Sequence, residues 1–131
     1  MRGYLSEVDQ EAIRGLIGGK LIECIGFNWN PEDLDSFVYI HLIFDLGDLV
    51  LEPGSLAEDV SMISVEDFNS DVLEKGYSHK DINFNKIERP FSRFDLADDK
   101  GYCHSSVTLW FGDIGMKAAG LDDILVRFVD L

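Results

Sequence analysis

The stretch FVYIHLIFDLGDLVLE, residues 37–52, decides the fold of this chain. So many β-branched and aromatic residues in one run favour an extended strand whose two faces are both covered. Successive side chains of a strand point to opposite faces, which puts Val38, Ile40, Leu42 and Phe44 on one face and Phe37, Tyr39, His41 and Ile43 on the other. Residues 45–48 include two aspartates and a glycine, as expected where a chain reverses. We therefore predict a central β-hairpin.

A chain of 131 residues, 46% hydrophobic and 27% charged, has the composition of a globular protein. Its length fits a single domain over residues 1–131. The N-terminal residues contain no apolar segment of the kind found in secretion signals, and the longest uncharged apolar run is too short to span a bilayer. We therefore expect a cytoplasmic protein in which Cys24 and Cys103 are thiols.

Start and stop signals predict a helix near the N-terminus. Ser6 and Asp9 form a capping-box pattern, and Gly18-Gly19 ends the helical spacing of apolar residues. We predict further strands at 21–29, 60–65, 81–87, 106–111 and 124–129. Between them we expect a polar connector at 67–77 with a short helical turn around Val72 and Leu73, a long loop at 91–101 and a helical turn at 116–119. The predicted class is α+β, a mostly antiparallel β-sheet of about five to seven strands with the N-terminal helix packed on one face. Its expected core includes Val38, Ile40, Leu42, Phe44, Val107, Leu109, Val126 and Phe128.

The charge is large and unevenly placed. The chain has 11 Lys and Arg against 25 Asp and Glu, a net charge of -14. Between Leu21 and Glu74 there is no Lys or Arg at all, so this segment holds nearly the whole imbalance. Such a field repels nucleic acids and anionic membranes, and it attracts a basic protein.

Motifs for catalysis or metal binding are missing from the sequence. The histidines and cysteines do not have the spacing of a metal site. There is no Gly-x-Ser-x-Gly motif, and adjacent acids such as Asp98-Asp99 arise in a chain this acidic without any role. We expect no catalytic residue, no metal and no cofactor, and a role that is not enzymatic.

One histidine supports a different class of function. His41 lies in the middle of the predicted hairpin, on the same face as Tyr39. A histidine in a sheet is usually a structural residue held by a backbone partner. The alternative is that Tyr39 and His41 form the floor of a pocket in a small enzyme or ligand-binding domain.

The charge favours a protein-binding role instead. A tryptophan ringed by charge has the composition of a binding hot spot, and the partner-binding residues that we predict are Trp29, Glu32, Asp33, Asp35, Glu58, Asp59, Glu66 and Asp67. In size, charge and lack of catalytic motifs, the chain is similar to the small, acidic, cytoplasmic immunity proteins that block bacterial toxins, especially nucleases. This resemblance rests on no family motif, and it implies a basic toxin as the partner of a monomer or homodimer.

Overall fold

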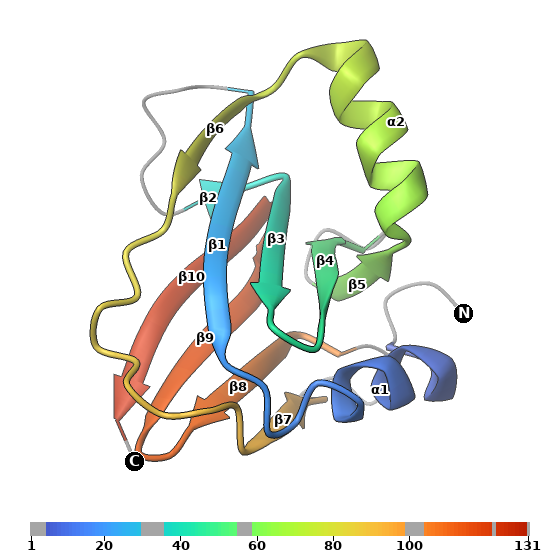
Figure 1. Cartoon of the computed structure of the whole chain (residues 1–131). Helices are drawn as coiled ribbons and strands as arrows, with labels where there is room; N and C mark the ends of the chain where they lie inside the picture. Colours follow the sequence, from blue (N-terminus) through green and yellow to red (C-terminus); the bar gives the residue numbers. More distant parts are fainter. Residues whose placement is uncertain (1–4, 30–35, 55–58, 99–103, 122, 131) are drawn as a thin grey trace.

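Two five-stranded antiparallel sheets make up most of the fold (Figure 1). The computed structural model describes residues 5–29, 36–54, 59–98, 104–121 and 123–130. The first sheet has the order β5 (Val60–Ile63), β4 (Gly47–Pro53), β3 (Tyr39–Phe44), β1 (Leu21–Asn28), β6 (Ser78–Asp81). The second has the order β2 (Ser36–Phe37), β10 (Asp123–Asp130), β9 (Ile114–Leu121), β8 (Ser106–Phe111), β7 (Arg93–Ala97). The mostly antiparallel structure is confirmed, but the prediction of one sheet is wrong.

The predicted central hairpin is formed by β3 and β4, which pair from Phe44↔Gly47 onward around a two-residue turn. Phe37 does not lie on the face predicted for it. It belongs to β2 and pairs with Ile124 of the second sheet. The chain changes sheets at Val38, whose N–H donates to the carbonyl of Phe27 at 2.7 Å. The alternation of inward and outward side chains therefore restarts after Val38. As a result, Phe37 and Ile40 both face the main core.

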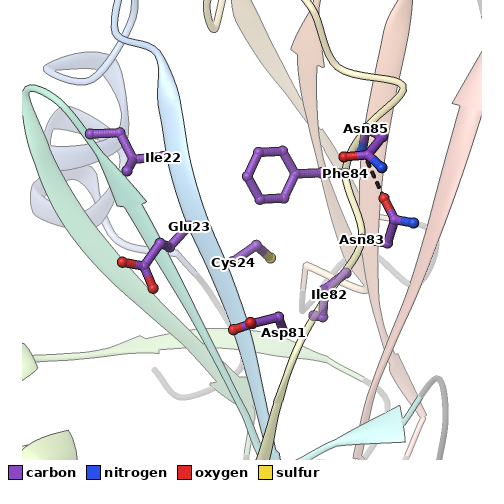
Figure 2. A pocket seen from close by; sticks show the side chains of 8 residues that line it. All are labelled: Ile22, Glu23, Cys24, Asp81, Ile82, Asn83, Phe84 and Asn85. Carbon is purple, nitrogen blue, oxygen red and sulfur yellow. Dashed lines mark hydrogen bonds between the residues drawn. The ribbon is translucent and has the colours of Figure 1, made fainter.

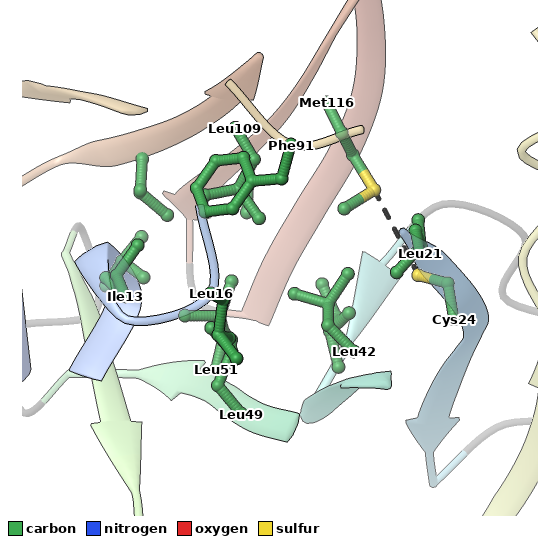
Figure 3. Packing of buried hydrophobic residues seen from close by; sticks show 14 of the residues in the cluster. Ile13, Leu16, Leu21, Cys24, Leu42, Leu49, Leu51, Phe91, Leu109 and Met116 are labelled. Atoms are coloured by element: carbon green, nitrogen blue, oxygen red, sulfur yellow. Dashed lines mark hydrogen bonds between the residues drawn. The ribbon is translucent and has the colours of Figure 1, made fainter. Parts of the chain in front are cut away.

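The main core lies between the two sheets (Figure 3). Of the residues expected there, five are buried and come from β3 and β8, namely Ile40, Leu42, Phe44, Val107 and Leu109. The other expected core residues, Val38, Val126 and Phe128, are half-buried. The rings of Phe44, Phe91 and Phe111 meet in this core, and they join β3 of the first sheet to β8 of the second.

The N-terminal helix α1 (Glu7–Arg14) begins as predicted, because Ser6 and Asp9 make both hydrogen bonds of the capping box. It does not lie across a sheet face. It lies beside β7 and the β3–β4 turn at one end of the two sheets (Figure 1), with the Arg14 guanidinium 5.8 Å from the centre of the Phe94 ring. Of the apolar side chains on this helix, Ile13 is buried and Val8 is exposed.

A second helix, α2 (Val65–Lys75), replaces the polar connector predicted at 67–77. Its start and stop signals are present in the sequence. The Ser64 hydroxyl accepts a hydrogen bond from the N–H of Asp67, and Gly76 ends the helix with the left-handed φ of 65° that glycine tolerates. Neither helix in the described part of the chain has the length and apolar character needed to cross a membrane.

Three further predictions are wrong in the C-terminal half. The loop predicted at 91–101 contains β7, and the helical turn at 116–119 is part of β9. Gly112, with a φ of 72°, forms a tight turn that pairs Phe111 with Ile114, so the chain returns as a strand. The strand predicted at 81–87 ends at its first residue, since β6 runs from Ser78 to Asp81. Beyond it, the apolar side chains of this segment pack on the main core without strand pairing.

Candidate protein-binding face

Helix α2 covers part of the outward face of the first sheet. Phe68 anchors it there, with its ring 5.1 Å from the Phe27 ring and 5.2 Å from the Tyr39 ring. Val50 and Tyr77 complete this second, smaller core. The first sheet is thus buried on both sides along this half, which explains the continuous apolar run in β3.

Helix α2 packs over Tyr39 and His41, the two residues predicted to form the floor of a pocket. Tyr39 is 7% exposed. The His41 ring lies 5.1 Å from the Phe68 ring, and its Nε2 lies 2.7 Å from Asp48 Oδ2. Both residues therefore help to hold α2 against the sheet.

A bulge in β1 decides which of its side chains face outward. The register shifts between Leu21 and Glu23, so Leu21 and Cys24 both face the main core. Glu23, Ile25 and Phe27 then alternate onto the outward face. Regular alternation over 21–29 would put Leu21 on the same face as Ile25, but the bulge inserts a residue between them and turns Leu21 to the other face.

Carboxylates gather on this outward side of the molecule. Phe27, Tyr39 and Val50 of the second core face outward, so the strand residues that alternate or pair with them face outward as well. These include four acids, namely Glu23, Asp48, Glu52 and Asp81. Helix α2 adds Glu66, Asp67, Asp71 and Glu74. We call these residues together the acidic face. The only Lys or Arg side chain described on it is Lys75, since that of Lys80 lies over the Phe37 ring on the inner side.

The outward face of the second sheet carries charges of both signs. Lys117 alternates with the core residues of β9 and pairs with Arg127 of β10, which puts both side chains outward. Arg93 lies over the Trp110 ring at 4.8 Å on the same side. Two carboxylates lie on this face as well: Asp95, which accepts a hydrogen bond from Arg93 at 2.6 Å, and Asp123, which alternates with Ile124 on β10. Among the described residues, the second sheet thus mixes bases and acids on its outward face, whereas the acidic face has Lys75 as its one Lys or Arg.

The predicted partner-binding residues differ in their positions and in their exposure. Trp29, 62% exposed, lies at the end of β1, and Glu66 and Asp67 are exposed in the first turn of α2. Glu32, Asp33, Asp35 and Glu58 lie outside the residues that the structure describes.

Asp59 is the exception, since it is fully buried and its predicted surface position is wrong. Two glycines make room for it. A Cβ on Gly54 would lie 1.9 Å from Asp59 Oδ2, and one on Gly120 would lie 2.2 Å from the Asp59 carbonyl oxygen. The Gly54 N–H also donates to that carbonyl at 3.0 Å. Asp59 therefore belongs to the packing between β4 and β9.

Asp71 ties α2 to the strands beneath it. Its Oδ2 accepts hydrogen bonds from the hydroxyls of Tyr39, at 2.6 Å, and Tyr77, at 3.0 Å. Lys75 Nζ lies 3.6 Å from Oδ1. The Tyr39 hydroxyl, with smaller contributions from Tyr77 and Lys75, holds the pKa of Asp71 below its ordinary value. Burial and the Asp71 carboxylate raise the pKa of Tyr77 to about 12.

We predict that Asp71→Asn makes the free energy of unfolding less dependent on pH in the acidic range. A carboxyl whose pKa is lowered in the folded state stabilises it above the unfolded pKa, and this stabilisation is lost as pH falls through the folded pKa. The free energy difference between wild type and Asp71→Asn should therefore be largest near neutral pH and shrink below the ordinary value of 3.8. Urea unfolding at a series of pH values measures it. A difference that stays constant down to pH 2 would contradict the role of the carboxylate.

A hollow of about 380 Å³ opens beside β1 and is lined by residues 22–24 and 81–85 (Figure 2). The Ile82 N–H donates to the Cys24 carbonyl at 2.8 Å. Phe84 also lines the hollow. Burial raises the pKa of the Cys24 thiol to about 12, so it is protonated at neutral pH and is a poor nucleophile. The hollow therefore gives no support to an enzyme that uses this cysteine.

Sequence reasoning missed Tyr77, Asp71 and Lys75, because it predicted only a short helical turn where the full helix α2 forms. It also missed Glu23 and Asp81 as members of one face, although their two-residue spacing from Ile25 and His79 carries that signal. Comparisons with models of protein families, with curated proteins and with solved structures found no match.

Proposed function

We propose that this chain is an acidic protein-binding module whose acidic face holds a basic protein. The closest kind of role is that of an immunity protein that neutralises a basic bacterial toxin, such as a nuclease. The observation that carries the proposal is the one-sided charge of the acidic face, where Lys75 is the one described Lys or Arg. On the outward side of the second sheet, by contrast, Arg93, Lys117 and Arg127 are mixed with Asp95 and Asp123.

Solubility alone does not require this arrangement. Charge that serves only solubility can be spread over the whole surface with both signs mixed. Carboxylates collected on one face repel each other and lower stability, and the cations of a partner offset this cost. Such a face raises the association rate with a cationic protein by electrostatic steering.

The proposal predicts that retention of a basic partner depends on where charge is removed. One variant carries Glu23→Gln, Glu66→Gln and Asp81→Asn, which neutralise exposed acids of the acidic face. It should lose most of a basic protein that the wild type retains from lysate at low salt, and the loss should be smaller near 0.5 M salt, where charges more than about 4 Å apart are screened. Mass spectrometry of the retained proteins measures this.

The matched control removes the same charge elsewhere, through Glu88→Gln, Asp98→Asn and Asp113→Asn, all at exposed positions. The control should retain the same basic protein as the wild type. Equal losses for the two variants would mean that only net charge matters, and the acidic face would then be a solvated surface.

A further inference from the structure

An exposed tryptophan is held in place at the edge of the acidic face. Trp29 is 62% exposed, yet its ring lies 4.4 Å from the Tyr77 ring, which is 9% exposed. Tyr77 is fixed in turn by its hydrogen bond to Asp71. The indole therefore presents its surface to solvent from a supported position, which reduces the ordering cost of binding. Supported, exposed tryptophans are typical anchors of protein interfaces.

A cation already lies at this tryptophan. Lys75 Nζ is 6.0 Å from the centre of the Trp29 ring and 3.6 Å from Asp71 Oδ1. Both distances are at the outer limit of their interactions, because a charge-assisted hydrogen bond is closer to 2.8 Å. The Lys75 side chain is also 46% exposed. The contacts are therefore weak enough for another cation to replace them.

Asp71 has one oxygen well suited to such a cation. Its Oδ2 accepts hydrogen bonds from two tyrosine hydroxyls, whereas Oδ1 makes the long contact to Lys75. A planar guanidinium can donate to a carboxylate oxygen and stack on an indole at the same time, which an ammonium group does less well. Arginine is thus the side chain that fits this site best.

We propose that Trp29, Tyr77 and Asp71 form a receptor for an arginine side chain of the basic partner, and that Lys75 occupies this receptor in the unbound protein. The inference rests on the proposed function for the cationic nature of the partner. It adds a defined anchor to what would otherwise be a diffuse charge attraction. On binding, the arginine displaces Lys75 into solvent.

A labelled hexa-arginine peptide tests the receptor by fluorescence anisotropy at low salt. Lys75→Met removes the competing cation and keeps an unbranched side chain. Its peptide affinity should rise about two- to fivefold more than that of Lys86→Met, the fold-change expected of an exposed cation–π contact. Lys86→Met is the matched control, because it makes the same charge change at another exposed position. Trp29→Leu should weaken binding, whereas Leu73→Ala, at a side chain that is 88% exposed on α2, should not.

The location of the peptide is read from Trp29 itself. The chain has two tryptophans, so a Trp110→Phe background leaves Trp29 as the single emitter. Its fluorescence should change on titration with hexa-arginine and change less with hexa-lysine. Equal affinities for Lys75→Met and Lys86→Met, with no change in Trp29 emission, would overturn the receptor and leave the charge-driven function standing. Peptide binding at Trp29 without retention of any basic protein would support the receptor and contradict the function.

Discussion

Replacing Phe111 by alanine should lower the free energy of unfolding by about 3–5 kcal/mol, the range for a buried phenylalanine truncated in a core. Phe111 is 1% exposed on β8 of the second sheet. Its ring is stacked on that of Phe44 from the first sheet at 6.3 Å and lies 5.6 Å from the Phe91 ring. The substitution opens a cavity where the two sheets meet. Urea unfolding followed by circular dichroism measures the loss, which corresponds to a fall in Tm of roughly 10–20 °C.

Phe111→Leu is the control for this result. It keeps most of the apolar volume, so it should cost less than about 1.5 kcal/mol if the site adjusts to the new shape. Near wild-type stability for Phe111→Ala would contradict the packing of the two sheets through this aromatic group.

The sequence predicts strands well where apolar residues alternate between clear turn signals. The hairpin of β3 and β4, the edge strand β5, and the strands β8 and β10 were all recognised in this way. The alternation of apolar residues does not indicate to which sheet a strand belongs. Phe37 and Tyr39 are two residues apart and occupy different sheets, because the chain breaks its pattern at Val38. Only pairing over long distances along the chain decides this, and pairing is a tertiary property.

The remaining errors have local causes. The segment Met116–Ala119 consists of residues with high helix propensity, but Gly112 forms a tight turn that returns the segment along β8 as β9. The full helix α2 was not predicted because its sequence is mostly polar. Its buried side is narrow, with Phe68 as its only fully buried residue. Its Ser64 cap and Gly76 stop were readable signals. The acidic segment was recognised from composition, yet the face it forms depends on the β1 bulge and on α2.

Helix α2 brings together the charges of the acidic face, so loosening its seat should affect both stability and binding. Phe68→Ala removes the 2% exposed ring that packs against Phe27, Tyr39 and His41. We expect a loss of about 3–5 kcal/mol in the free energy of unfolding. Amide hydrogen exchange should show the largest loss of protection in α2 and smaller losses in β8 and β9, which lie in the other sheet.

Leu73→Ala is the matched control on the same helix. Its side chain is 88% exposed, so the change in free energy should stay within about ±0.5 kcal/mol. If α2 positions the receptor, Phe68→Ala should also weaken binding of the hexa-arginine peptide, although it removes no charge, because Asp71 and Lys75 move with the helix. If the destabilised Phe68→Ala protein binds the peptide with unchanged affinity, then binding depends on net charge and not on the position of α2.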